Sequence, residues 1–289
     1  MRRFRFLPDS PTVGCQPLTA RRALEDFPIG NVPLRDHQIQ ALGGDWPSSG
    51  SIEVYPHAWL EAEDVAAFMS DPTCPALVDA QGAELMLRGG ATGAPRVATR
   101  SFLIRFAWDL LQVHERALKA RTHWENLGQC HGSLYVDGRL AVGEGTRILP
   151  GVVVEGDVVI GAGCKVGPNC YIRGATTVGD GCHVGQAVEL KNSILLAKTN
   201  VGHLSYVGDS ILGEKVNFGA GTIVSNLRHD GKAHRSMVDG ELVDTQRRKF
   251  GAIIGDGVHT GIHTSIYPGR KIWPGLTTRP GDIVDRDLV

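Results

Sequence analysis

The stretch that decides the fold runs from Val136 to Leu196 and reads VDGRLAVGEGTRILPGVVVEGDVVIGAGCKVGPNCYIRGATTVGDGCHVGQAVELKNSILL. Neither an α-helix nor an ordinary strand has a period of six residues. This period is typical of hexapeptide repeats, which build a parallel β-helix from one short strand and one corner per repeat. An aliphatic residue occupies every sixth position, namely Val136, Val142, Ile148, Val154, Ile160, Val166, Ile172, Val178, Val184, Leu190 and Leu196.

The repeat continues beyond Leu196 with two slips of one residue, and a polar excursion at residues 228–251 interrupts it. Residues 131–289 are therefore predicted to form a β-helix of about seven coils, with roughly three hexads per coil. The inward positions after the first stretch are Val201, Val207, Leu212, Phe218, Val224, Ile254, Thr260, Ile266, Ile272, Thr278 and Val284.

Residues 1–130 lack the six-residue period, and short apolar runs alternate there with Pro, Gly and Ser. Apolar spacing predicts helices near Trp59–Met69 and Arg100–Arg121. We expect an α+β domain that ends where Gly128 and Gly132 precede the first coil.

Charge is balanced, with 30 Lys and Arg against 31 Asp and Glu, which gives no indication of a nucleic-acid or membrane partner. The first residues, MRRFRFLPDS, lack the apolar segment of a secretion signal, so a cytoplasmic location is expected. Three of the six cysteines, Cys164, Cys170 and Cys182, share one inward position of the repeat, where small side chains fit. They are predicted to be buried free thiols.

Two cations stand three hexads apart, because Arg173 follows Ile172 and Lys191 follows Leu190. They should stack on one face, about 4.8 Å apart, which is costly unless an anionic group lies between them. Asn226 should return to that face two coils later. His203 and Tyr206 are expected on the preceding face, with Tyr206 at the corner.

The stretch VELKNSILLAKTNVGHLSYVGDSILGEKVNFGAGTIVSNLRHDG, residues 188–231, resembles the acetyltransferase domain of the bacterial bifunctional GlmU enzyme and related archaeal sugar-1-phosphate enzymes. The later stretch RRKFGAIIGDGVHTGI, residues 247–262, is more similar to the archaeal branch. The resemblance implies a left-handed β-helix, usually a homotrimer with shared sites. It also implies acetyl transfer from acetyl-CoA, without a metal, to the amine of glucosamine-1-phosphate or galactosamine-1-phosphate.

The resemblance also implies the roles of individual residues. His203 corresponds to the general base, for which a neutral imidazole is suited. Arg173 and Lys191 correspond to phosphate-binding residues, and a donor at Asn217 or a backbone N–H around Ala220 could stabilise the thioester oxygen. The remaining sugar- or acetyl-contacting positions are Tyr206 and Asn226, and a further lysine of the family corresponds to Lys232 or lies elsewhere in the excursion. The positions near coenzyme A are Ala220 and Ile262, and Ile262 replaces a serine of the bacterial enzymes.

The N-terminal stretches CQPLTARRALEDFPIGNVPLRDHQIQALG (residues 15–43) and AWDLLQVHERAL (residues 107–118) are similar to parts of sugar-1-phosphate nucleotidyltransferases. The family's glycine-rich loop is replaced by LPDSPTVG, and its two lysines fall on Leu24 or Glu25 and on Val32. The resemblance implies a shortened domain without nucleotidyltransferase activity.

Three alternatives stay open at this point. A hexapeptide metalloenzyme of the γ-carbonic-anhydrase type has a His-x4-His pattern, which His229 and His234 match, but they lie off the repeat without a third histidine in register. A non-catalytic scaffold or regulatory protein could retain a sugar-phosphate site. The same chemistry could also act on another amino sugar, including a nucleotide-linked one.

Overall fold

The computed structural model describes residues 4–8, 13–43 and 52–289. The chain divides into two compact units, one of residues 1–12 and 22–106 and one of residues 13–21 and 107–289. The second unit thus begins before the boundary near residue 130 that the loss of the repeat suggests, because it includes helix α3 (Asp109–Ala120). Part of the segment LPDSPTVG, residues 9–12, lies outside the described residues.

The first unit is built on a five-stranded mixed sheet with the order β1-β4-β7-β6-β8. Its core gathers apolar side chains such as Phe4, Val54, Phe68, Leu77 and Met86. The elements are β1 (Phe4–Phe6), η2 (Leu24–Asp26), β2 (Pro28–Ile29), β3 (Val32–Pro33), α1 (Leu34–Ala41), β4 (Ile52–Val54), β5 (Ala58–Trp59), α2 (Ala62–Ser70), β6 (Ala76–Val78), β7 (Glu84–Arg88), β8 (Arg96–Val97) and β9 (Phe102–Leu103).

Both predicted helices are present, and the second is shorter than expected. The prediction Trp59–Met69 corresponds to α2, whereas Arg100–Arg121 corresponds to α3 with a later start. Phe102 and Leu103 instead form β9, which pairs antiparallel with β5. The apolar spacing therefore placed the start of this helix too early, because Phe102 pairs with Trp59 in a sheet instead.

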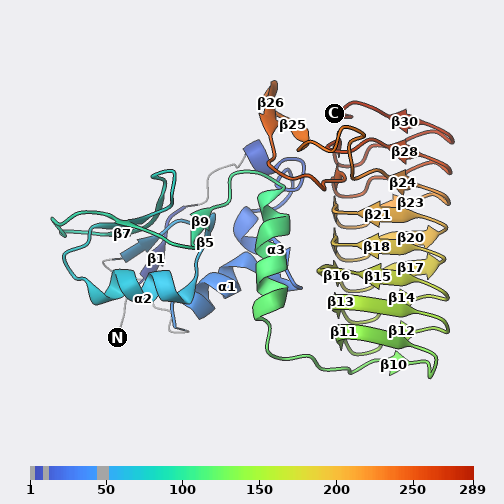
Figure 1. Cartoon of the computed structure of the whole chain (residues 1–289), viewed down its shortest axis with the longest axis horizontal. Helices are drawn as coiled ribbons and strands as arrows, with labels where there is room; N and C mark the ends of the chain where they lie inside the picture. The colour runs from blue at the N-terminus through green and yellow to red at the C-terminus, as the bar shows by residue number, and fades with distance from the viewer. Residues whose placement is uncertain (1–3, 9–12, 44–51) are drawn as a thin grey trace. The chain divides into compact units, whose positions relative to one another are not determined.

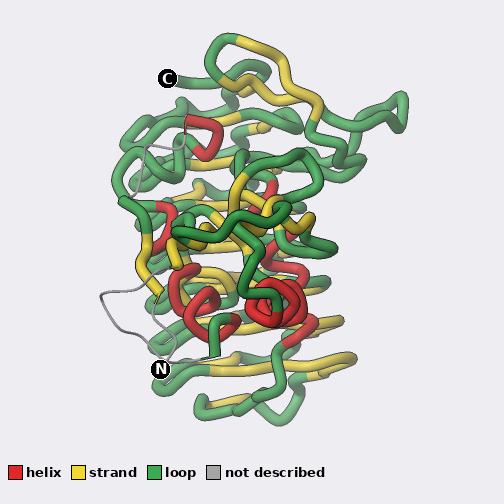
Figure 2. The backbone as a smooth tube through the Cα atoms, turned by 90° about the vertical axis from the view of Figure 1, so that its left-hand side faces the viewer, coloured by secondary structure: helices red, strands yellow, loops and turns green. Residues whose placement is uncertain are grey.

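The second unit is a parallel β-solenoid, as the six-residue period predicts, and it is of the left-handed type that the resemblance implies (Figures 1 and 2). Three faces carry the stacked strands. The first face consists of β10 (Gln129–Cys130), β12 (Arg147–Ile148), β14 (Lys165–Val166), β17 (His183–Gln186), β20 (Asn200–His203) and β23 (Asn217–Phe218). The second consists of the first parts of β11 (Tyr135–Val142) and β13 (Val153–Ile160), then β15 (Tyr171–Arg173), β18 (Glu189–Lys191), β21 (Tyr206–Gly208), β24 (Ile223–Val224), β28 (Ser265–Ile266) and β30 (Ile283–Val284). The third consists of the last parts of β11 and β13, then β16 (Thr176–Val178), β19 (Ile194–Leu195), β22 (Ile211–Leu212), β27 (Ile253–Ile254) and β29 (Lys271–Ile272).

The predicted number of about seven coils is not confirmed. On the first face the six strands are followed by two further levels, at the bridged residues His259 and Thr277. The excursion forms its own antiparallel hairpin, β25 (Arg235–Val238) with β26 (Glu241–Asp244).

The inward register is confirmed at nearly all predicted positions, where one continuous apolar core fills the solenoid. Leu196 departs from this register, because Leu195 pairs with Val178 and takes the place in the core. The first shortened repeat therefore lies between Leu190 and Leu195, one corner earlier than the sequence suggests. Val136 keeps the register by pairing with Val154 but is 38% exposed.

The outer side of the third face is buried and mostly apolar, with Thr177 and Lys271 as its polar positions. Its outward positions Ala141, Val159, Ile194, Ile211 and Ile253 are buried. Helix α3 lies beside this face and packs Leu118 against Ala141 and Val159 (Figure 1). This packing explains why α3 belongs to the solenoid unit.

The three cysteines of the repeat are buried and free, as predicted. Burial raises the pKa of Cys170 to about 11 and that of Cys182 to about 12, and also raises the pKa of Cys164.

Because the thiolate is the reactive species, we expect Ellman's reagent at about pH 8 to modify half-buried Cys130 alone in the folded protein. All six thiols should react in denaturant. A Cys130→Ser variant should be silent when folded, and rapid reaction of a second thiol would contradict this packing.

No helix in the described part of the chain is long and apolar enough to cross a membrane.

Candidate functional site

Arg173 and Lys191 stack as the hexad spacing predicts. They end β15 and β18 and are direct partners in the parallel pairing of these strands. Each has its own carboxylate. Arg173 Nε and Nη2 lie 2.8 and 2.7 Å from Glu189 Oε1, and Lys191 Nζ lies 2.8 Å from Asp209 Oδ2. The hydrogen bond to Glu189 raises the pKa of Arg173. The anionic groups beside the stack are thus part of the protein, and the stack does not by itself require an anionic ligand.

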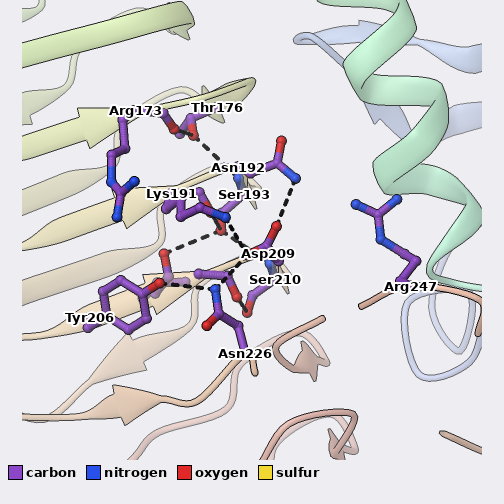
Figure 3. A network of polar contacts seen from close by, with 12 residues as sticks. Arg173, Thr176, Lys191, Asn192, Ser193, Tyr206, Asp209, Ser210, Asn226 and Arg247 are labelled. Carbon is purple, nitrogen blue, oxygen red and sulfur yellow. Dashed lines mark hydrogen bonds and ion pairs between the residues drawn. The ribbon is translucent and has the colours of Figure 1, made fainter. Parts of the chain in front are cut away.

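Asp209 is the centre of the polar network in Figure 3. It occupies a corner after β21 with φ of 49°, and only 2% of its surface is exposed. Its Oδ2 accepts from Lys191 Nζ and, at 2.5 Å, from Asn226 Nδ2, while its Oδ1 accepts from Asn192 Nδ2 at 3.1 Å. Its N–H also donates to the Lys191 carbonyl at 2.7 Å. One buried carboxylate therefore holds three side chains, two from the preceding coil and one from the following coil.

Tyr206 lies on the second face with Arg173 and Lys191, because it pairs in register with Glu189. The expectation that it lies at the corner of the preceding face is wrong, since Leu204, with φ of 49°, makes that corner. Asn226 Nδ2 donates to the Tyr206 hydroxyl at 3.0 Å. Burial is the largest cause that raises the pKa of Tyr206, and Asp209 and Glu189 add to it.

His203 ends β20 on the first face and is exposed. Its carbonyl accepts from the Ser205 hydroxyl at 2.7 Å and from the Gly221 N–H at 3.1 Å, which fixes the backbone beneath the ring. The corner at Leu204 separates it from Tyr206. The structure thus places the imidazole one corner away from the Arg173–Lys191 stack.

The remaining predicted residues are placed unequally. Asn217 is exposed on the first face, one level beyond Asn200 of β20. Ala220 lies in the turn that follows, and its carbonyl accepts from His263 N at 2.8 Å. Ile262 is 50% exposed. Lys232 is exposed in the excursion, where its N–H donates to Asp230 Oδ1 at 3.1 Å. Among the described residues, no hydrogen bond or ion pair joins its side chain to the network around Asp209.

Sequence reasoning missed a link from this network to α3. Asn192 Nδ2 donates to Glu115 Oε1 at 2.9 Å, and Arg247 Nη2 donates to the same oxygen at 2.7 Å. Arg247 belongs to the polar excursion, but its side chain is only 18% exposed and forms an ion pair with Glu115 of α3. One sequence signal for part of this network was available. Asn192 and Asp209 occupy the same corner in successive coils, so their side chains can be expected to lie close together.

Gly208 leaves room for the contact between Tyr206 and Asn226. A Cβ at this position would lie 2.6 Å from Asn226 Nδ2 and closer still to the Tyr206 hydroxyl.

We therefore expect Gly208→Ala to displace both side chains and to weaken binding of a ligand on the second face about 10-fold or more, the loss expected for a good hydrogen bond. Isothermal titration would measure this change, with circular dichroism as the check on folding. Gly202→Ala is the matched control, since a Cβ there meets no atom within 4 Å. Unchanged affinity in a folded Gly208→Ala protein would contradict the description.

In the described residues, no group of three His, Cys, Asp or Glu side chains is arranged to hold a metal ion. Of the two histidines in the excursion, His229 is exposed, and His234 is buried with Nε2 3.1 Å from the Asn226 carbonyl.

Comparison with known proteins relates the chain to sugar-1-phosphate enzymes. A family model described as the GMPPB C-terminal domain matches residues 154–274. A bifunctional sugar-1-phosphate nucleotidylyltransferase/acetyltransferase of Sulfurisphaera tokodaii is 40% identical over 181 residues, which cover 63% of this chain and 45% of that protein. The bifunctional protein GlmU of Methanococcus aeolicus is 40% identical over 184 residues, 62% of this chain and 44% of that protein.

Among solved structures, the polysialic acid O-acetyltransferase OatWY matches 56% of this chain and 80% of its own, with 15% identity and a TM-score of 0.27. The chain spans under half the length of the two bifunctional relatives. The predicted resemblance to GlmU-like sugar-1-phosphate proteins is confirmed, and the name of the first relative includes the predicted acetyltransferase class.

Proposed function

We propose that the protein is an acetyl-CoA-dependent N-acetyltransferase that acts on a hexosamine-1-phosphate, either glucosamine-1-phosphate or galactosamine-1-phosphate. The observation that supports this most is the arrangement of Arg173, Lys191, Tyr206 and Asn226 on one face, a single corner away from His203.

The two cations keep donors for a phosphate although each has a carboxylate partner. A guanidinium has five N–H groups, and Arg173 uses Nε and one Nη2 position on Glu189. An ammonium has three, and Lys191 uses one on Asp209. Phosphate oxygens bound to the rest would fix the sugar, and this positioning supplies part of the rate enhancement.

His203 takes the role of general base. The substrate ammonium must lose a proton before its nitrogen can attack the thioester carbonyl, and the exposed imidazole is free to accept that proton. The attack places negative charge on the thioester oxygen, which the Asn217 amide or the Ala220 N–H would stabilise. Collapse of this intermediate breaks the C–S bond, and the second proton of the nitrogen passes to the sulfur, which leaves the amide and the free coenzyme A thiol.

Acetyl-CoA is the co-substrate, and the transfer requires no metal. Ala220 and exposed Ile262 are the proposed coenzyme A contacts, with Lys232 as a further substrate contact from the excursion. We propose a homotrimer in which neighbouring subunits complete each site, since no hydrogen bond or ion pair joins Lys232 to the network around Asp209 among the described residues of one chain. The cytoplasm, where acetyl-CoA is available, is the proposed location.

The N-terminal unit is proposed to be a shortened nucleotidyltransferase-like domain that does not make nucleotide sugars. Leu24, Glu25 and Val32 occupy the positions where the resemblance calls for lysines. A direct check is nucleotide-sugar formation from UTP and N-acetylglucosamine-1-phosphate, which we expect to be absent.

The proposed activity is tested by thiol release from acetyl-CoA with each hexosamine-1-phosphate. Free glucosamine and a nucleotide-linked amino sugar are the comparison acceptors. Turnover that requires the 1-phosphate supports the proposal. Tight binding of the sugar phosphates without turnover would replace it with the non-catalytic scaffold, and turnover only with the nucleotide-linked sugar would change the acceptor.

A further inference from the structure

We propose that Asp209 is a positioning residue that fixes the hydrogen-bonding polarity of the substrate site. It makes Tyr206 present a donor and Asn226 present an acceptor to the ligand, beside the Lys191 ammonium, which can only donate. This inference rests on the proposed function for the identity of the ligand, but the polarity itself is a property of the free protein.

Asp209 sets the orientation of the Asn226 amide. Both hydrogens of its Nδ2 are used, one on Asp209 Oδ2 at 2.5 Å and one on the Tyr206 hydroxyl at 3.0 Å. The carboxylate only accepts hydrogen bonds, so it selects the nitrogen side of the amide. No donor among the described residues bonds to Asn226 Oδ1, which stays available to a hydroxyl or ammonium of a ligand.

The oriented Asn226 amide in turn sets the direction in which the Tyr206 hydroxyl donates. Because its oxygen accepts from Asn226, its own hydrogen is not used in that contact. The hydroxyl therefore donates outwards, towards a ligand oxygen. Lys191 keeps two of its three N–H groups for the same side. Together these groups suit a ligand with an anionic or oxygen-rich end next to a hydroxyl or ammonium, as in a hexosamine-1-phosphate.

Asp209 itself is held in place by hydrogen bonds to its side chain and its backbone. Its Oδ1 is held by Asn192, whose same Nδ2 donates to Glu115 of α3. Arg247 binds the Glu115 oxygen from the excursion. The backbone of Asp209 is bonded on both sides, to Lys191 O at 2.7 Å and from Gly251 N at 2.8 Å. Helix α3 and the excursion thus support the carboxylate through Glu115 and Arg247.

Asp209→Asn tests the polarity because the new side chain has the shape of aspartate but replaces one acceptor oxygen by an NH₂ donor. The new amide meets donors from Lys191, Asn192 and Asn226, so Asn226 is expected to turn and direct its Nδ2 to solvent. KM for the hexosamine-1-phosphate should rise about 10- to 100-fold, as for loss of hydrogen bonds to a charged group, with KM for acetyl-CoA within about twofold. Asp256→Asn is the matched control, since Asp256 is a half-buried aspartate that accepts from Glu214 N elsewhere in the solenoid.

Exchange of the Asn226 side-chain amide hydrogens, followed by NMR without ligand, gives a readout that does not depend on activity. The signal is identified by its loss in Asn226→Asp. Exchange should be slow in the wild type and in Asp256→Asn, and at least about 10-fold faster in Asp209→Asn. Asn192→Gly, which suits the positive φ of 48°, should give an intermediate increase and serves if Asp209→Asn does not fold.

Unchanged amide exchange in both folded variants would overturn the proposal. So would an unchanged KM for the sugar phosphate in an active Asp209→Asn protein. If the wild type neither binds nor acetylates any sugar phosphate, the proposed function fails, and the exchange measurement alone still decides whether Asp209 sets the polarity.

Discussion

Replacement of His203 by alanine is expected to lower kcat for acetyl transfer about 10²- to 10⁴-fold, the contribution of a placed general base. The ring is exposed and no described residue hydrogen-bonds to it, so its loss should not affect folding. KM for the hexosamine-1-phosphate should stay within about twofold, because Arg173 and Lys191 hold the phosphate. Steady-state kinetics of thiol release measure both quantities.

The pH profile separates a base from a structural role for His203. Wild-type kcat/KM should fall at acidic pH, where histidine side chains are protonated, and the residual activity of His203→Ala should lack this fall. His131→Ala is the matched control, since His131 is an exposed histidine of the first coil. A His203→Ala protein with normal kcat would remove the residue from the mechanism.

Loss of the cation stack is expected to give the second large effect. Arg173→Gln with Lys191→Gln should raise KM for the sugar phosphate about 100-fold or more, because hydrogen bonds between charged groups are the strongest that the site offers. The variant should also lose its preference for the phosphorylated sugar over free glucosamine. Competition by inorganic phosphate, measured in the same assay, should be weakened to a similar extent.

The chain contains a matched control for this experiment. Arg147 and Lys165 are also direct partners in adjacent strands, on the first face, and both are exposed. Arg147→Gln with Lys165→Gln removes the same charges elsewhere on the solenoid and should leave KM nearly unchanged. Equal effects of the two double variants would show that general charge, and not the stack beside Asp209, attracts the substrate.

The solenoid was predictable from the sequence because its inward positions repeat in a simple way. Each inward side chain, for example Ile172 or Leu190, must fill the same core in successive coils, so the constraint recurs every six residues. The cation stack follows from the same register, because residues three hexads apart pair directly. The shortened repeat before Leu195 was misplaced by one corner, because adjacent leucines at 195 and 196 both satisfy the pattern.

The contacts around Asp209 were not predictable in the same way. Asn192 and Asp209 lie at corners, where the repeat sets the backbone but not the direction of a polar side chain. Glu115 and Arg247 reach the network from a helix and from an excursion, neither of which follows the period. The start of α3 was also missed, because the pairing of β9 with β5 outweighs local helical spacing.

The most direct test of the central claim is identification of the product formed from acetyl-CoA and glucosamine-1-phosphate, with galactosamine-1-phosphate in parallel. Two-dimensional NMR of the reaction mixture distinguishes an acetamide at the sugar nitrogen from an acetate ester at a hydroxyl. We predict N-acetylhexosamine-1-phosphate and one equivalent of free coenzyme A, both formed at least about 100-fold more slowly by His203→Ala. An O-acetylated product would contradict the account. So would the absence of any product from either sugar with a folded wild-type protein.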